Sequence, residues 1–532
     1  MIMFKLKKQY VTAFGLSFCL MASAGEAADE VAELYTQHCA SCHGADRLGG
    51  TGPAMLPENL SRLRRSQALM VIKGGSAATQ MPAFGDKLSD KQVLGLVDYI
   101  YTPLPAIPRM GMAEIKATQV IHHACGSLPD KPVYEADPLN VFLVVELGDH
   151  HATVLDGDRL EPIHRFQTRF ALHGGPKYSS DGRFVYLASR DGWISKFDMY
   201  NLKTVAEIRA GINTRNLAVS GDNRYVMVAN YLPHTLVLLD ARDLSPIKVI
   251  DVGDDSGKTS RVSAVYSAPP RHSFIAALKD MKEVWEIKVW ETSFRSKAVG
   301  LPVYSGLMYE YSQNSEEIPL SDRHSFSIRR IKLADFLDDF FFDQDYLHLI
   351  GAARDGAKGQ VVNLVVGRKI ADLDLSGMPH LGSGITWDYE GKTVLATPNL
   401  KEGVVSVIDM ASWKTIRRIK TLGPGFFMRS HENTPYAWVD VFFGPHKDVV
   451  HVIDKRSLEI VKTLRPAPGK RAAHVEFDRY GRYALLSVWD REGALVIYDA
   501  KSLEEVKRLP MRKPSGKYNV YNKIHFSSGT SH

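Results

Sequence analysis

Hydrophobic and polar positions follow two different patterns along the chain, and the pattern changes near residue 133. Before this point, apolar residues recur at helical spacing over residues 29–44 and 88–100, and Ser89 is placed to cap the second segment. After it, short apolar runs alternate with turns rich in Gly, Asp and Asn, which is typical of β-strands. The sequence therefore predicts a small helical domain followed by a large β domain.

The β domain contains an eleven-residue repeat that starts with aspartate. Its copies begin at Asp156, Asp198, Asp240, Asp409, Asp454 and Asp499. Neighbouring copies are 42 or 45 residues apart, and the interval between the third and the fourth corresponds to about four periods, with degenerate copies near Glu286 and Asn363. A strand–turn–strand unit with this period predicts an eight-bladed β-propeller. Residues 293–345 exceed what a blade needs, and "LADFLDDFFFD" within them is predicted to be an inserted helix or lid loop.

Composition and the first residues of the chain restrict the function classes. The 532 residues suffice for two or more domains, and a net charge of +6 without a basic cluster gives no reason to expect nucleic-acid binding. A basic start, an apolar run and then small residues predict a secretory signal peptide over residues 1–28 and a periplasmic location. No later apolar run has the length of a transmembrane segment.

The helical domain carries the attachment motif of a c-type haem. In "CASCH", Cys39 and Cys42 are placed to form thioethers and His43 to bind the iron, and a thioredoxin-like pair would need a βαβ context that is absent here. Met81, on the loop before the last helix, is the predicted sixth ligand, and a His/Met pair suits electron transfer. The predicted organisation is a signal peptide (1–28), a cytochrome c domain (29–103), a proline-rich linker (104–132) and the propeller (133–532).

Histidine, arginine and tyrosine residues at predicted strand ends are candidates for a ligand site in the central channel of the propeller. They are His173, Arg190, Arg215, His380, His431, Arg471, His474 and Tyr518. Neutral imidazoles suit a second iron centre, and arginines suit ligand carboxylates, although each residue taken singly also fits a structural hydrogen bond or a salt bridge at a blade edge.

A small C-x-x-C-H domain joined to an eight-bladed propeller resembles the cytochrome cd1 nitrite reductase family. "CASCHG", "QMPAFG", "RMGMAEIK", "ASRDG", "PHLGSG" and "GKYNVYN" carry the resemblance over nearly all of the mature chain. It implies a haem d1 site in the propeller, with His173 as proximal ligand and His380 and His431 in the distal pocket. It also implies that Arg190, Arg215 and Arg471 hold the haem d1 carboxylates.

Two departures from the nitrite reductases favour a different activity. His474 stands where those enzymes carry a small residue, and Tyr518 where they carry phenylalanine. Both residues are shared with the dihydro-haem d1 dehydrogenases of the same family. This resemblance implies that the chain oxidises a propionate side chain of dihydro-haem d1 to acrylate, with haem c as the electron outlet. We expect His474 to be the base, Tyr518 to hold the carboxylate or relay a proton, and His173 and His380 to bind the d1 iron.

Three other functions stay open on the sequence. A nitrite reductase would use His380 and His431 to protonate nitrite. A non-enzymatic carrier would bind haem d1 and pass it to a nitrite reductase, and haem c would exchange electrons with a periplasmic acceptor. The third alternative is a propeller that binds another small molecule.

Overall fold

The computed structural model describes residues 29–61, 63–76, 81–289, 326–353, 356, 358–375 and 377–525. The chain forms two compact units, one ending at Arg109 and the other starting at Met110. The predicted signal peptide and residues 293–325 of the predicted insertion lie outside the described residues. None of the described helices is long and apolar enough to cross a membrane.

The first unit is helical. A helix over residues 29–38 is followed by α2 (Ala40–His43), α3 (Arg65–Gly74) and α4 (Asp90–Ile100). Ser89 caps α4 by accepting a hydrogen bond from the Gln92 amide at 3.3 Å, as its position predicts. The buried face of α4 packs on Tyr35 and Phe84 to form one apolar core.

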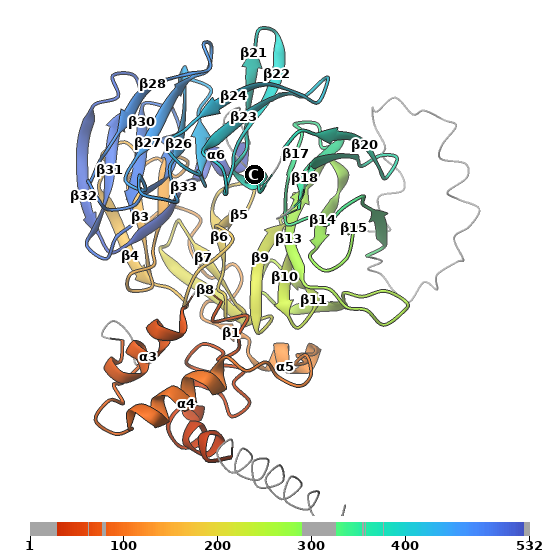
Figure 1. Cartoon of the computed structure of the whole chain (residues 1–532), viewed down its shortest axis with the longest axis vertical. Coiled ribbons are helices and arrows are strands. Elements are labelled where there is room, and N and C mark those ends of the chain that lie inside the picture. The colour runs from red at the N-terminus through yellow and green to blue at the C-terminus, as the bar shows by residue number, and fades with distance from the viewer. Residues whose placement is uncertain are drawn as a thin grey trace, which may run out of the picture. The chain divides into compact units, whose positions relative to one another are not determined.

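The second unit is an eight-bladed propeller of antiparallel sheets, as predicted (Figure 1). The first four sheets, each given from its innermost strand outward, are β33 (Pro514–Asn519), β2 (Val141–Glu146), β3 (His151–Asp156) and β4 (Pro162–Gln167); β5 (Lys177–Tyr178), β6 (Phe184–Ala188), β7 (Trp193–Asp198) and β8 (Lys203–Arg209); β9 (Asn213–Val219), β10 (Tyr225–Leu232), β11 (Thr235–Asp240) and β12 (Pro246–Asp251); β13 (Val262–Ala268), β14 (Ser273–Leu278), β15 (Glu283–Lys288) and β16 (Ile328–Lys332).

The other four sheets follow the same plan. They are β17 (Asp339–Phe342), β18 (His348–Ala352), β19 (Gly359–Asn363) and β20 (Arg368–Leu373); β21 (Ile385–Tyr389), β22 (Lys392–Pro398), β23 (Val404–Asp409) and β24 (Lys414–Lys420); β25 (Met428–Ser430), β26 (Tyr436–Asp440), β27 (Val450–Asp454) and β28 (Glu459–Leu464); β29 (Ala472–Phe477), β30 (Tyr483–Val488), β31 (Gly493–Asp499) and β32 (Glu505–Met511). Short 3-10 turns η1 (Pro269–Arg271) and η3 (Leu381–Ser383) and helix α6 (Val520–His525) complete the unit.

The position of a strand in its blade explains its sequence pattern. Middle strands such as β10 and β11 are almost continuously buried because neighbouring blades cover both of their faces. Outermost strands such as β20 and β28 alternate between exposed and less exposed residues, since one face meets solvent. The first strands of neighbouring sheets contact one another, as β9 contacts β13, and so surround a common axis (Figure 1).

The aspartate repeat marks one turn in six blades. In each copy the aspartate ends the third strand and its carboxylate accepts the amide two residues later, at 2.8 Å in Asp454. The residue four positions after the aspartate has a left-handed φ of 55° to 64° in all six copies. The degenerate copy at Asn363 keeps the turn with an asparagine and places Gly367 at the left-handed position, with φ 68°.

Two segments differ from the sequence-based expectation. "LADFLDDFFFD" is not a helix or a lid, because its second half forms the innermost strand β17 and buries Phe340 and Phe342 between blades. Part of the predicted linker 104–132 belongs to the second unit, where α5 (Met112–Ala117) buries Ile115 against a blade and β1 (Val120–Ile121) pairs with β8. Elements this short leave no periodicity in the sequence.

Candidate haem-binding sites

The C-x-x-C-H motif lies where the first helix of unit 1 ends. The Cys39 amide donates to the Tyr35 carbonyl at 2.8 Å, and the His43 amide donates to the Cys39 carbonyl at 2.9 Å, so all three motif residues share one turn. Cys39 and Cys42 are free and half-buried thiols. The arrangement leaves both sulfur atoms available for thioether bonds.

His43 has the hydrogen bonding of an iron ligand. Its Nδ1–H donates to the Pro53 carbonyl at 2.8 Å, which leaves the lone pair on Nε2 for a metal. Burial lowers the pKa of the ring, so the neutral form that binds iron is favoured. The backbone of Gly52 approaches the ring so closely that a Cβ there would lie 2.7 Å from His43 Cε1. These residues fit a covalently bound haem.

Met81 lies in the same unit, half-buried against the apolar core around Phe84 and Leu88. Its carbonyl accepts the Ser76 amide at 3.0 Å, which fixes the backbone of the loop. Its role as sixth ligand stays a prediction.

We expect the Met81→Ala variant to change the visible spectrum of the haem and lower its reduction potential, because a thioether ligand stabilises the reduced iron. Met55 packs on the same core and provides the control. Met55→Ala should leave both properties unchanged, and an unchanged Met81→Ala spectrum would exclude Met81 as the ligand. Absorption spectra and a redox titration measure the two effects.

In the second unit, His173 and Arg215 lie together at the channel. His173 Nδ1–H donates to the Arg215 carbonyl at 2.6 Å, and Arg215 Nη1 donates to His173 Nε2 at 2.8 Å. The ring therefore has the tautomer that an Nε2-bound iron needs. The guanidinium, whose Nε also donates to the Ser263 carbonyl at 3.0 Å, must turn away for a metal to bind. Such a movement would free Arg215 for a carboxylate.

His380 precedes η3 and has a similar geometry. Its Nδ1–H donates to the Phe426 carbonyl at 2.6 Å, and its Nε2 lies 3.8 Å from Asp339 Oδ2, beyond hydrogen-bond distance. The rings of Phe426 and Phe427 lie 4.2 and 6.0 Å away, between centroids. Burial lowers the pKa of His380, so the ring is neutral near pH 7. His380 is thus suited to bind iron or a ligand polar group through Nε2.

The backbone of His474 is strained and firmly held. His474 is the extra residue of a bulge in β29 and has a left-handed φ of 56°. Its amide donates to Asp440 Oδ2 at 3.1 Å, and its carbonyl accepts a hydrogen bond from Lys517 Nζ. Asp440 also accepts the amides of Phe426 and Phe427 at 2.7 and 3.0 Å. One carboxylate thus connects the His474 bulge with the segment whose Phe426 carbonyl holds His380. Strain of this kind is typical of functional sites.

The His474 side chain is buried and available for chemistry. It is 2% exposed, and its Nδ1 has no hydrogen-bond partner among the described residues. The ring lies 4.7 Å from Phe427 and 5.1 Å from Tyr518, between centroids. Burial, together with the surrounding cationic side chains, holds the pKa of His474 well below 6.5. The ring is therefore a neutral potential base in a largely dry environment.

Tyr518 connects His474 to the His173 loop. It stands on β33, and the backbone of Gly175, at φ 69°, approaches the phenol ring so closely that a Cβ would lie 3.3 Å from Cε1. Burial raises the pKa of Tyr518 to about 12, so the hydroxyl stays protonated and can donate.

The two remaining arginines lie just outside strands, Arg190 in the turn between β6 and β7 and Arg471 directly before β29. The Arg190 amide donates to the Ala171 carbonyl at 3.1 Å, which places this residue beside the His173 loop. Arg471 precedes β29 and stacks on Phe442, with Cζ 4.5 Å from the ring centre. Its buried Nε has no hydrogen-bond partner in the part of the chain that the structure describes. Both positions are compatible with contacts to ligand carboxylates.

The expectation for His431 requires a correction. His431 is fully buried beyond the other end of β25, its Nε2–H donates to the Arg479 carbonyl at 3.1 Å, and its Nδ1 accepts the Asn433 amide at 3.1 Å. Both ring nitrogens thus fix turns of the backbone, and His431 does not join His173, His380 and His474.

Sequence reasoning missed a group of buried or half-buried charged residues on the innermost strands, at the end of β26 and on α6. They are Lys177, Arg429, Asp440, Glu476, Lys517 and Lys523. The sequence signal was weak, because a single charge in a short strand usually faces solvent. Only the packing of neighbouring blades covers these positions.

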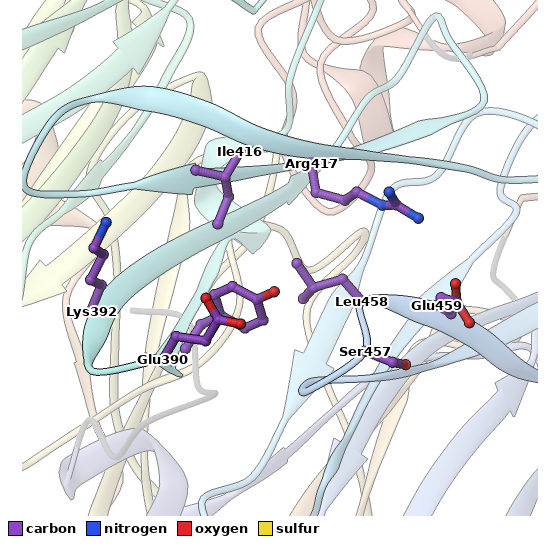
Figure 2. Close-up of a pocket in the computed structure, with 8 residues that line it drawn as sticks. Glu390, Lys392, Ile416, Arg417, Ser457, Leu458 and Glu459 are labelled. Atoms are coloured by element: carbon purple, nitrogen blue, oxygen red, sulfur yellow. The ribbon is translucent and has the colours of Figure 1, made fainter.

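A surface pocket of ≈ 450 Å³ lies away from these residues (Figure 2). It is formed by outer parts of two neighbouring blades, with Ile416 and Leu458 among side chains of both charges. It contains none of the predicted site residues and is not the candidate site.

Comparisons with known proteins cover both units. The model of the family "Cytochrome D1 heme domain" matches residues 136–298 and 311–523, and that of "Cytochrome C oxidase, cbb3-type, subunit III" matches residues 26–100. The dihydro-heme d1 dehydrogenase of Pseudomonas aeruginosa is 56% identical over 98% of this chain and 99% of its own. The nitrite reductase of Stutzerimonas stutzeri is 25% identical over 96% of each chain. The solved structure of dihydro-heme d1 dehydrogenase NirN in complex with DHE superimposes with a TM-score of 0.84, at 56% identity, over 92% of this chain and 99% of its own.

Proposed function

The chain belongs to the cytochrome d1 family and, within it, to the dihydro-haem d1 dehydrogenases, and from this we propose that it oxidises a propionate side chain of dihydro-haem d1 to acrylate. It is an oxidoreductase with an N-terminal cytochrome c domain. The nitrite reductase of Stutzerimonas stutzeri is a more distant relative, at 25% identity, so we favour the dehydrogenation over nitrite reduction.

The observation that carries the proposal is the neutral and buried imidazole of His474 beside Tyr518, whose Nδ1 has no hydrogen-bond partner among the described residues. Conversion of –CH₂–CH₂–COO⁻ to –CH=CH–COO⁻ releases two electrons and two protons. A neutral histidine in a site that excludes water is a suitable acceptor for the proton of the C–H bond. Tyr518, which stays protonated, donates a hydrogen bond to the carboxylate.

Other residues of the channel bind and orient the substrate. We assign His173 and His380 to its iron because each keeps Nδ1–H on a backbone carbonyl and can present Nε2. Arg190, Arg215 and Arg471 are assigned to its carboxylates. His431, by contrast, holds the backbone.

Haem c, held by Cys39, Cys42 and His43 with Met81 as the proposed sixth ligand, would supply a one-electron acceptor, so the two electrons would leave in two successive one-electron transfers that end on the periplasmic acceptor. We further propose that the protein works in the periplasm, since the first 28 residues have the signal-peptide pattern and the attachment motif is typical of exported proteins. The N-terminal mass of the exported protein tests this location. Release of haem d1 to a nitrite reductase and reoxidation by a periplasmic acceptor complete the proposal.

Incubation of the holoprotein with dihydro-haem d1 and an electron acceptor tests the function directly. We expect a product that is lighter by two hydrogen atoms, identified by mass spectrometry. Binding without a change of mass, followed by transfer to an apo-nitrite reductase, would instead identify a carrier. Nitrite reduction by the loaded protein at rates of a nitrite reductase would support the other enzymatic alternative.

A further inference from the structure

Four cationic side chains gather beside Tyr518 in the interior of the propeller. They are Lys177 on β5, Arg429 on β25, Lys517 on β33 and Lys523 on α6. Lys523 Nζ lies 5.5 Å from the centre of the Tyr518 ring, and Arg429 and Lys523 both act electrostatically on His474. Among the described residues, the carboxylates that act on this group are Glu476 and Asp440, so its formal positive charges outnumber its formal negative charges by two.

The two carboxylates are already occupied. Asp440 accepts three backbone amides, as described above. Glu476 Oε1 accepts the Phe477 amide at 3.1 Å and the Asn522 side chain at 3.2 Å. Lys517 donates to Ser487 Oγ at 2.8 Å and to the His474 carbonyl. Both carboxylates thus already accept hydrogen bonds from other groups, and the two of them do not balance the four cationic side chains.

Arg429 is the least satisfied member. It is 4% exposed, its Nη1 donates to its neighbour's carbonyl, and its Nε lies 3.7 Å from Glu476 Oε2, beyond hydrogen-bond distance. Within the described residues this buried Nε has no hydrogen-bond partner. A buried guanidinium with an unused donor is costly unless a ligand completes it.

We propose that Arg429, together with Lys177 and Lys523, forms a binding site for the carboxylate of the side chain that is oxidised. The inference rests on the proposed function and adds a site to it. A carboxylate supplies the acceptor that Arg429 lacks and reduces the excess of positive charge. Because Arg429 acts electrostatically on both Tyr518 and His474, and Lys523 lies 5.5 Å from the Tyr518 ring, a carboxylate held there brings the adjacent CH₂ groups next to the His474 ring. Burial and the charge of Arg429 lower the pKa of Lys177 to about 8, and a bound carboxylate opposes this shift.

A binding cycle with the oxidised product, which needs no turnover, tests the site. The full-length protein and its Arg429→Gln variant are titrated with haem d1 and with its methyl ester, and absorbance reports the Kd. Losing a charge-assisted hydrogen bond is expected to weaken binding of the free acid by roughly 10- to 100-fold. The ester should bind both proteins equally. If Arg429→Gln leaves binding of the acid unchanged, or weakens acid and ester alike, the carboxylate site is excluded.

Two further variants make the result specific. Arg418→Gln removes an exposed arginine on β24 that pairs with Asp374, and it should change neither Kd. Lys523→Met, at a half-buried position on α6, should weaken binding of the free acid of haem d1 and leave binding of its methyl ester unchanged. This variant serves as the test if Arg429→Gln does not fold. Failure of this cycle leaves the dehydrogenase function intact, and failure of turnover leaves the cycle interpretable.

Discussion

The His474→Asn variant is expected to bind dihydro-haem d1 with nearly normal affinity and to convert it at least about 100-fold more slowly, the lower end of the effect of losing a general base. Asparagine is the informative replacement because it adopts the left-handed conformation at φ 56° more readily than other residues do. The variant keeps the hydrogen bond from the backbone amide of residue 474 to Asp440 and lacks the imidazole base. Product mass against time and an absorbance titration measure the two properties.

The control and the pH dependence separate a catalytic from a structural role. His164→Gln, on the outer strand β4, should convert substrate normally. In the unsubstituted protein, a base whose pKa is held well below 6.5 stays deprotonated at neutral pH, so kcat/KM should fall only at a pH below 6.5, as the ring becomes protonated. Normal turnover by His474→Asn would remove His474 from the mechanism.

The double variant Cys39→Ala/Cys42→Ala is expected to lose all covalently bound haem and all multiple turnover. Without the two sulfur atoms no thioether forms, and the first unit loses its electron acceptor. Haem staining after denaturing electrophoresis and product formation per protein molecule provide the measurements. Binding of the substrate should persist, because every residue assigned to it lies in the second unit.

Cys125 supplies a matched control. It is a free and exposed thiol of the second unit, and Cys125→Ala should retain covalent haem and full turnover. Sustained turnover by the double variant would show that the first unit is not the electron outlet.

Local signals made most of the fold predictable. The turn from Asp454 to Leu458 illustrates this. The aspartate accepts backbone amide hydrogen bonds, and Leu458 adopts a left-handed φ. The same turn recurs in the other blades that carry the aspartate repeat. The C-x-x-C-H motif was equally local, because one helical turn holds its three residues. The approach of His474 to Tyr518 was not local, and the resemblance to a known family rather than any spacing singled out that pair.

The rest depended on contacts between distant strands. His431 fits a ligand by residue type, yet two backbone groups use its nitrogens, one of them 48 residues away. Asp440 looked like the polar end of a strand, and only the packing of three segments shows that it holds both the backbone of Phe426 and the His474 bulge. The role of Arg429 was likewise not predictable from the sequence, since only the packing of the neighbouring strands leaves its buried Nε without a hydrogen-bond partner among the described residues.

The closure of the propeller has a consequence for the order of maturation. Strand β33, which pairs with β2 from the far side of the sequence, also carries Lys517 and Tyr518. Until β33 docks, β2 presents an unpaired edge to other chains, and the substrate channel lacks one wall. We therefore expect the substrate to bind with full affinity only after the ring has closed. Loading with the tetrapyrrole thus reports completed folding as well as the start of catalysis.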